Sequence, residues 1–394
     1  MWLVVGAGLS GAVLAERIAT KWNKQVLIID KRDHIGGNCY DYKDPETGIL
    51  MNKYGAHLFH TNNDKVWEYI NQFDTWKRWE HKVLSYVDSQ FVPVPVNITT
   101  VNMLLNENIQ NSQEMNQLLE KIQQKPSDGV IENSEQMAVS RVGRELYEKM
   151  FKPYTIKQWN RDPSELDASV LARIPVRDDF DVRYFADKYQ ALPANGYTSF
   201  FEKLLNNDLI NIKLNCDLFS ESGRKFLDDP NVEGVIYTGP IDQFFTNYGK
   251  QFSELNDLEE LEYRSIDFKI TRFKNIGYYQ PNSVVNYPEQ EYPYTRIIEY
   301  KHFLNQQSKD TVIVSETTND HGDPYYPIPN TRNLELYEKY RQMAEKLENN
   351  KGQGIENGKN IYFVGRLATY KYYNMDAAID AALKMFDKLN KNKE

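Results

Sequence analysis

The chain has 394 residues, 41% of them hydrophobic and 26% charged, which is the composition of an ordinary soluble protein with room for two or three packed units. A formal net charge of −9 argues against nucleic acid as a partner, so an anionic ligand would need a local cluster of arginines. No apolar run reaches the ~18 residues of a membrane span, and the first apolar segment is expected to be a strand rather than a leader peptide. Two cysteines, Cys39 and Cys216, cannot form a disulfide framework, so we expect a cytoplasmic location.

Residues 1–60 predict a dinucleotide-binding βαβ unit. The apolar run WLVVGAG ends in glycine, SGAVLAERIATKW has apolar residues at helical spacing, and QVLIID is typical of a buried parallel strand. Gly6 allows the tight turn, Gly8 lets a pyrophosphate approach the backbone, and Gly11 lets the helix pack closely on the sheet. Asp30 follows at the distance that suits a ribose contact. The plain alternative is a glycine turn that serves only packing.

Three further features favour FAD over NAD as the dinucleotide. The segment DKRDHIGGN follows the second strand directly, VIYTGP brings a later strand back to the same edge, and YFVGR supplies a second glycine before a second helix. This ordered set is typical of flavoproteins with two dinucleotide-binding domains. The residues expected from these segments to contact FAD are Gly6, Gly8, Gly11, Asp30, Lys31, Arg32, Gly37, Asn38, Thr238, Gly239 and Gly365.

The order of the expected elements predicts an α/β fold, in which a Rossmann-like FAD-binding domain carries an inserted helical domain and an antiparallel β-sheet domain. Residues 62–184 are expected to be mostly helical, with a mobile loop near residues 160–175, and residues 251–354 to form the antiparallel sheet. The discontinuous FAD-binding domain is expected to comprise residues 1–61, 185–250 and 355–394.

Six motifs, spread in order over nearly the whole chain, resemble those of the UDP-galactopyranose mutases. They are KYGAHLFHT (53–61), YTIKQW (154–159), RIPVR (173–177), YTGPIDQFF (237–245), PYTRIIEYKHF (293–303) and GRLATYKYYNMDAAI (365–379). The resemblance implies an isomerase that interconverts UDP-galactopyranose and UDP-galactofuranose without net redox change. It further implies FAD that is active when reduced, with flavin N5 acting as nucleophile at the anomeric carbon and displacing UDP.

The resemblance also implies roles for residues of the substrate site. Arg173 and Arg296 are expected to clamp the diphosphate, because a guanidinium stabilises the charge that grows on departing UDP. Arg173 follows QWNRDPSELDAS, which in the family is a mobile loop that closes on substrate. The residues expected to bind the uridine are Tyr154, Thr155, Trp159 and Tyr184. Those expected around the diphosphate and sugar are Asn286, Tyr326, Arg366 and Tyr372.

Further residues are expected beside the flavin from the same resemblance. His57 and His60 lie on a segment that in the family runs along the flavin, where a histidine can tune or protonate the reduced ring. Two histidines three residues apart, without a neighbouring acid or cysteine arrangement, predict no metal site. The other expected flavin contacts are Leu58, Arg366 and Met375.

Two positions depart from the family pattern. Asn374 stands where the family usually has Asp, which changes contacts near the flavin or the sugar. Asn160 stands where the family usually has Gly after Trp159, which is expected to stiffen the hinge of the mobile loop. The helical stretch around residues 100–140 is longer than in compact bacterial members.

Three other functions stay open from the sequence. The first is the same reaction on another nucleotide sugar, such as a dTDP-6-deoxyhexose or UDP-N-acetylgalactosamine, because the motifs specify the diphosphate clamp better than the hexose pocket. The second is an amine-oxidase-like flavin oxidoreductase, and the third is a flavin-free binding protein similar to the escort proteins of prenylated GTPases. The expected partners are a UDP-sugar, an unidentified electron donor and, from the resemblance, a second copy of the chain.

Overall fold

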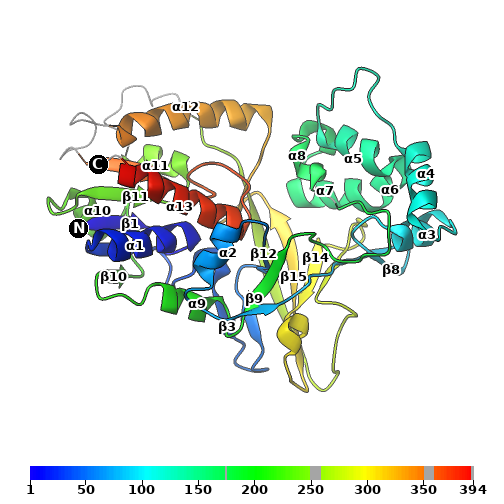
Figure 1. Cartoon of the computed structure of the whole chain (residues 1–394), viewed down its shortest axis with the longest axis horizontal. Helices are drawn as coiled ribbons and strands as arrows, with labels where there is room; N and C mark the ends of the chain where they lie inside the picture. Colours follow the sequence, from blue (N-terminus) through cyan, green and yellow to red (C-terminus); the bar gives the residue numbers. More distant parts are fainter. Residues whose placement is uncertain (174, 249–258, 350–358, 392–394) are drawn as a thin grey trace.

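The computed structural model describes residues 1–173, 175–248, 259–349 and 359–391. A parallel sheet with its helices forms one side of the molecule, a lobe of helices forms the other, and the long strands β12 and β15 lie between them (Figure 1). Within the described ranges, no helix is both long enough and apolar enough to cross a membrane.

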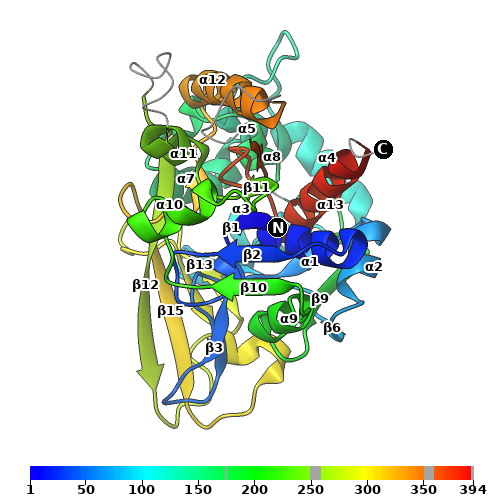
Figure 2. The ribbon, with the colours of Figure 1, turned by 90° about the vertical axis from the view of Figure 1, so that its left-hand side faces the viewer.

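The parallel sheet has the strand order β10-β2-β1-β11-β17. Its strands are β1 (Trp2–Val5), β2 (Val26–Ile29), β10 (Ile210–Lys213), β11 (Gly234–Tyr237) and β17 (Asn360–Phe363). Successive side chains point to opposite faces, so Val4 joins the core under α1 (Leu9–Trp22) and α13 (Met375–Lys391), whereas Leu3 joins the core on the other face. That second face is covered by α10 (Glu221–Asp228), α11 (Ile241–Tyr248) and α12 (Thr331–Glu348), as Figure 2 shows. Apolar strands covered on both faces are typical of a doubly wound sheet.

A second, seven-stranded sheet has the order β16-β12-β15-β14-β13-β7-β8 and is antiparallel except for the pair β13–β7. Its strands are β7 (Leu84–Val87), β8 (Gln90–Pro93), β12 (Tyr263–Phe273), β13 (Val284–Asn286), β14 (Arg296–Glu299), β15 (Thr311–Asn319) and β16 (Tyr326–Pro327). β7 and β8 therefore lie within the range that we expected to be mostly helical. The smaller sheets are β3 (Asp41–Lys43) with β4 (Leu50–Asn52), and β5 (Phe59–Thr61) and β6 (Trp76–Arg78) on either side of β9 (Tyr189–Pro193).

The helical lobe is built from short helices that begin at asparagine caps. Asn97, Asn111 and Asn133 each accept a hydrogen bond from a backbone N–H in the first turn that follows, which satisfies a donor that the helix itself cannot pair. The lobe comprises α3 (Ile98–Leu105), α4 (Ser112–Ile122), α5 (Ser134–Val142), α6 (Arg144–Leu146), a π-helical turn (Tyr147–Phe151), α7 (Lys152–Trp159) and α8 (Ser169–Ala172). Its own core includes Val101, Met115, Val139 and Tyr147.

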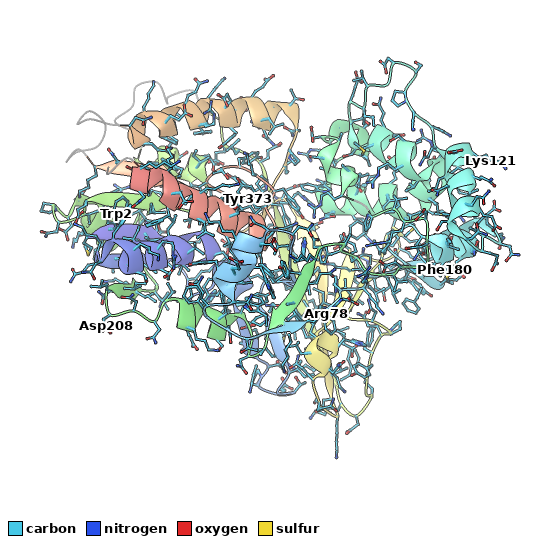
Figure 3. All side chains as sticks on the ribbon, in the orientation of Figure 1. Trp2, Arg78, Lys121, Phe180, Asp208 and Tyr373 are labelled. Atoms are coloured by element: carbon cyan, nitrogen blue, oxygen red, sulfur yellow. The ribbon has the colours of Figure 1, made fainter. Side chains whose placement is uncertain are left out.

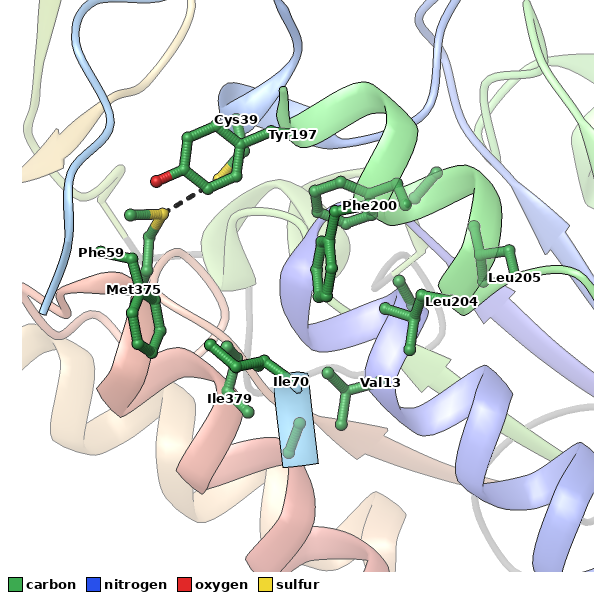
Figure 4. Close-up of a cluster of buried hydrophobic side chains, with 14 of the residues drawn as sticks. Val13, Cys39, Phe59, Ile70, Tyr197, Phe200, Leu204, Leu205, Met375 and Ile379 are labelled. Atoms are coloured by element: carbon green, nitrogen blue, oxygen red, sulfur yellow. Dashed lines mark hydrogen bonds between the residues drawn. The ribbon is translucent and has the colours of Figure 1, made fainter. Parts of the chain in front are cut away.

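A cluster of buried side chains fixes the first turn of α13 against α9 (Tyr197–Leu204) and β5 (Figure 4). Cys39 donates a hydrogen bond from its thiol to the sulfur of Met375, with 3.6 Å between the two sulfur atoms. Burial raises the pKa of the Cys39 thiol to about 12, so this group is a neutral donor. The packing holds the N-terminal end of α13 at the edge where the parallel strands end.

Candidate active site

Two cavities adjoin at the carboxyl ends of the parallel strands. The glycine cavity, of about 270 Å³, lies against the turn between β1 and α1. The arginine cavity, of about 260 Å³, is lined from the seven-stranded sheet, the helical lobe and the loop before α13. Both are lined by the same five residues, which we call the junction: Asn38, His57, Arg366, Asn374 and Met375. Tyr373, labelled in Figure 3 at the N-terminal end of α13, lies beside the junction and lines the arginine cavity.

The backbone of the β1–α1 turn leaves no room for side chains at two of its glycines. Gly6 has a φ of +107°, and a Cβ atom there would lie 2.1 Å from the Thr238 hydroxyl oxygen. A Cβ atom on Gly11 would lie 2.0 Å from the Gly6 carbonyl oxygen, so Gly11 permits the close packing of α1 but does not itself line the cavity. The first residues of α1 line the cavity, and a helix N-terminus offers unpaired N–H groups to an anion.

Asp30 directly follows β2, and backbone N–H groups fix its carboxylate. Oδ2 accepts a hydrogen bond from the Ala7 N–H at 2.7 Å, and Oδ1 accepts one from the Arg32 N–H at 2.9 Å. Asp323, which no sequence motif predicted, reaches the same cavity from the loop between β15 and β16. Its carboxylate lies 3.1 Å from the Lys31 ammonium and 3.7 Å from the Arg32 guanidinium. The seven-stranded sheet thereby contributes to the rim of the glycine cavity.

The structure brings most of the sequence-predicted residues to the two cavities. Of the residues expected at FAD, all line the glycine cavity except three: Gly11, which lies in the first turn of α1 and packs against the β1–α1 turn, and Leu58 and His60, which line only the arginine cavity. The arginine cavity is lined by all ten residues expected at the substrate, namely Tyr154, Thr155, Trp159, Arg173, Tyr184, Asn286, Arg296, Tyr326, Arg366 and Tyr372. Gln158 and His81 also line this cavity, although no role was expected for either residue from the sequence.

The arginine cavity is cationic although the whole chain is acidic. Arg173 ends α8, Arg296 begins β14 and Arg366 follows β17, and all three line the cavity. Among the described residues that line this cavity there is no Asp or Glu. Arg296 is paired with the Glu316 carboxylate, which does not line the cavity, and neither Arg173 nor Arg366 forms an ion pair with a described residue, so the wall keeps a net positive charge that favours an anionic ligand.

Arg296 is held by a carboxylate that no sequence motif predicted. Its Nε donates a hydrogen bond to Oε2 of Glu316, the residue opposite on β15, at 2.5 Å. Burial opposes the charge of Arg296, but the Glu316 carboxylate raises the pKa of the guanidinium well above its ordinary value. The terminal guanidinium nitrogens make no hydrogen bond to any described residue. The only sign of Glu316 in the sequence is that it is an isolated acidic residue within the apolar segment that forms β15.

Aromatic rings surround the two other arginines. The Arg173 guanidinium lies 4.2 Å from the centre of the Tyr372 ring, and the Arg366 guanidinium lies 5.5 Å from that of Tyr326. The rings of Tyr326 and Tyr372 are 5.1 Å apart, and Trp159 adjoins both. Burial and, to a smaller extent, the neighbouring Tyr372 raise the pKa of Tyr326 to about 12. The Tyr326 phenol is therefore neutral at physiological pH and can donate a hydrogen bond to an anion.

Three histidines line the arginine cavity. His57 pairs its Nδ1 with the Gly55 carbonyl oxygen at 2.9 Å, and burial lowers its pKa to about 4, so it is neutral. Burial likewise lowers the pKa of His81 to about 3, and its Nδ1 has no hydrogen-bond partner among the described residues. His60 pairs its Nδ1 with Oδ2 of Asp187 at 2.8 Å. Neither His81 nor Asp187 was identified from the sequence.

The two departures from the family pattern occupy different places. Asn374 lies at the junction, and its backbone carbonyl oxygen accepts a hydrogen bond from the Ala378 N–H at 3.1 Å in the first turn of α13. Asn160 ends α7 in the left-handed conformation, with a φ of 50°. Its amide nitrogen donates to Oδ2 of Asp320 at 2.7 Å, which ties the end of α7 to the loop after β15.

Comparisons with known proteins agree with this arrangement. Residues 149–372 match the family described as UDP-galactopyranose mutase, and residues 4–73 match an NAD(P)-binding Rossmann-like domain. A probable UDP-galactopyranose mutase of Klebsiella pneumoniae is 38% identical over 98% of this chain and 93% of that protein. A dTDP-fucopyranose mutase of Escherichia coli is 34% identical over 97% of this chain and 96% of that protein. A crystal structure of reduced UDP-galactopyranose mutase matches with a TM-score of 0.74 at 14% identity, over 99% of this chain and 93% of that one.

These likenesses bear on two expectations from the sequence. The α/β fold, with a Rossmann-like domain and a sheet domain rich in antiparallel pairs, is confirmed by the domain match and by the structural superposition. The family indicated by the six motifs is confirmed by a match over more than half of the chain and by relatives that align along nearly all of it. The chain belongs to the UDP-galactopyranose mutase family.

Proposed function

We propose that the chain interconverts UDP-galactopyranose and UDP-galactofuranose, with reduced FAD in the glycine cavity and the UDP-sugar in the arginine cavity. The junction carries this proposal, because five residues line both cavities and a ligand of one would there meet a ligand of the other. Family membership supplies the reaction class, which is that of an isomerase.

The glycine cavity fits FAD on three grounds. A side chain at Gly6 would fill the space beside Thr238, the Asp30 carboxylate is fixed by two backbone N–H groups, and the N-terminus of α1 faces the same space. The cavity continues to the junction, so the ring system of a dinucleotide bound there would reach the arginine cavity. Bound and reduced, FAD supplies a nucleophilic nitrogen for the anomeric carbon.

The arginines of the second cavity have two tasks in this proposal. Arg296, whose Nε is occupied by Glu316, presents its terminal nitrogens to the diphosphate and stabilises the charge that grows on UDP as the anomeric C–O bond breaks. Arg173 is exposed beside Tyr372 at the end of α8, from where it can join the diphosphate as the loop closes. The neutral phenol of Tyr326 donates a hydrogen bond, and the aromatic rings exclude water from the reacting centre.

A dTDP-6-deoxyhexose is the second candidate substrate. The relative from Escherichia coli named dTDP-fucopyranose mutase is 34% identical over nearly the full length. In addition, Val83, Val94 and Val284 line the arginine cavity and offer an apolar surface against which a C6 methyl group could pack. Either substrate uses the same diphosphate clamp.

The test measures which sugar nucleotide turns over and under which redox condition. The purified protein should show a flavin absorption spectrum and, after bleaching with dithionite, should convert UDP-galactofuranose to UDP-galactopyranose, as followed by chromatography. Unreduced protein is the control, and dTDP-fucofuranose is the competing substrate. A colourless protein, or turnover that requires oxygen, would refute the proposal. Turnover of the dTDP-sugar alone would select the second candidate.

We also propose a cytoplasmic location, a homodimeric state and a separate electron donor for the flavin. Both cysteines are free and buried, which suits a reducing compartment, and a flavin that works only when reduced is maintained most readily there. The dimer rests on the family resemblance alone. Equilibrium sedimentation of the holoprotein measures the oligomeric state directly.

A further inference from the structure

His60 is held by contacts on two sides of its ring. Its Nδ1 lies 2.8 Å from Oδ2 of Asp187, while the second oxygen of Asp187 accepts a hydrogen bond from the Asn62 side chain at 2.7 Å. The imidazole also stacks on the Phe185 ring, with 3.6 Å between centroids and 14° between planes. The carboxylate and the stacked ring together fix both the position and the tilt of the imidazole.

The carboxylate also decides which ring nitrogen faces the cavity. Because Asp187 accepts a hydrogen bond, Nδ1 carries a proton, and Nε2 is the nitrogen left for other partners. His60 lines the arginine cavity, and Nε2 makes no hydrogen bond to any described residue. Asp187 does not line this cavity but lines a separate groove formed with residues of β6 and β9. His60 thus presents Nε2 to the arginine cavity, while the carboxylate of Asp187 stays outside that cavity.

The proposed reaction needs a group that both gives and takes a proton. When the pyranose becomes the furanose, the bond between the C5 oxygen and the anomeric carbon breaks, and a bond from the C4 oxygen forms. One proton must be delivered to the C5 oxygen and one removed from the C4 hydroxyl. No electron is gained or lost overall, and the sugar keeps its composition.

Several other protonatable groups of this cavity are poorly suited to the transfer. Burial lowers the pKa of His57 to about 4 and that of His81 to about 3, so neither holds a proton near neutral pH. Burial raises the pKa of Tyr326 to about 12, so its phenol does not readily release one. No carboxylate lines the cavity within the described part of the chain. His60 differs from these groups in its geometry, because its Nδ1 is paired with a carboxylate and its Nε2 has no described partner in the cavity.

We propose, resting on the function proposed above, that His60 is the proton-transfer residue for ring opening and closure and that Asp187 is its positioning residue. The imidazolium donates its Nε2 proton to the C5 oxygen as that bond to the anomeric carbon breaks. The resulting imidazole then removes the proton of the C4 hydroxyl as the new ring bond forms, which restores the imidazolium. The reverse reaction uses the same two transfers in the opposite order.

The test separates cleavage at the anomeric carbon from rearrangement of the ring. UDP-galactopyranose labelled with ¹⁸O at the anomeric bridging position loses the label to a non-bridging phosphate position whenever the bond to UDP breaks and re-forms, which ³¹P NMR detects. In reduced holoenzyme, His60→Gln should slow formation of the furanose ~10²-fold, while positional exchange stays within about threefold of wild type. Asp187→Asn should slow furanose formation about tenfold with the same preserved exchange.

A matched control is Lys188→Ala, which alters the residue next to Asp187 and removes an exposed ion pair with Asp64 and a cation–π contact with Tyr189, but leaves Asp187 and His60 unchanged. Both rates should be unchanged in that variant. Equal losses of exchange and of furanose formation in His60→Gln and Asp187→Asn would overturn the inference, because a purely structural defect lowers both. Undiminished furanose formation would overturn it as well. Failure of wild-type protein to isomerise or exchange would instead refute the underlying function.

Discussion

Arg296 and Glu316 face each other across β14 and β15, with 2.5 Å between Nε and Oε2, and this pair anchors the cationic wall of the arginine cavity. Glu316 is only 2% exposed, and its other carboxylate oxygen has no hydrogen-bond partner among the described residues. A buried pair of this kind contributes little net stability, but the loss of one partner leaves the other charge uncompensated. The pair therefore fixes Arg296 in place for an anion.

We predict that Glu316→Gln destabilises the fold and that bound UDP stabilises the variant more than it stabilises the wild-type protein. Loss of the buried counter-charge should lower the free energy of unfolding by about 3 kcal/mol, as measured by chemical denaturation. Saturating UDP should restore more stability to the variant than to wild type, because the diphosphate supplies the missing negative charge. The control is Asp267→Asn, an exposed carboxylate on β12 that should change stability little. Equal stabilisation of both proteins by UDP would contradict the assignment.

We predict that Arg173→Ala and Arg296→Ala each lower kcat/KM at least ~10²-fold while FAD remains bound. Each variant removes a guanidinium from the diphosphate but leaves the glycine cavity intact. The measurement combines turnover of reduced enzyme with flavin content from the absorption spectrum. Arg78→Ala on β6, where the side chain is highly exposed and lines neither cavity, should leave both unchanged. Near-normal kcat/KM in either cavity variant would show that the diphosphate lies elsewhere.

We predict that Asn160→Gly loosens the loop that carries Arg173. The Asn160 side chain binds Asp320, which also pairs with the buried Arg264, and Arg264 donates to the Gln158 carbonyl oxygen. Glycine tolerates the φ of 50° but removes the bond to Asp320. Amide hydrogen exchange in residues 161–172 should accelerate severalfold, and KM should rise about threefold with kcat kept. Asn106→Gly, at the left-handed end of α3, is the control, and unchanged exchange after Asn160→Gly would refute this hinge.

We predict that His81 makes the fold sensitive to acid. Its pKa is lowered by burial to about 3 in the folded state, below the usual ~6.5 of the unfolded chain. The contribution of neutral His81 to the free energy of unfolding is therefore fully present above about pH 6.5. It declines as the pH falls toward about 3, by up to about 1.4 kcal/mol per pH unit. His81→Gln should flatten the profile in this range, whereas His321→Gln, at an exposed loop position, should not. An unchanged slope in His81→Gln would contradict the prediction.

Local motifs explain what the sequence could predict about the site. The turn at Gly6, the acid at Asp30 and the arginines Arg173 and Arg296 lie in short segments whose spacing or resemblance is readable without a structure. These segments all border the two cavities, although the roles of their residues stay predictions. Four strands of the parallel sheet, β1, β2, β11 and β17, were foreseeable for the same reason, because their apolar runs are followed by a helix or a glycine turn. The fifth strand, β10, is mostly exposed and was not predicted.

Pairings between distant segments explain what the sequence could not predict. Asp187 meets His60 only because β9 returns beside β5, and Glu316 meets Arg296 only through the register of β15 on β14. The strand β7 pairs in parallel with β13, some two hundred residues later, so its short apolar run among helices gave no sign of a sheet. A single sequence does not encode such registers in any local pattern.

The proposed reaction requires reduced flavin although it consumes no electrons overall. The most direct measurement reduces the holoenzyme photochemically with one equivalent of electron pairs per flavin, removes the reductant and counts the UDP-galactopyranose formed from UDP-galactofuranose without oxygen. We predict many products per flavin, no loss of reduced flavin, and loss of activity on reoxidation. One product or fewer per electron pair, or equal activity of oxidised enzyme, would contradict the account.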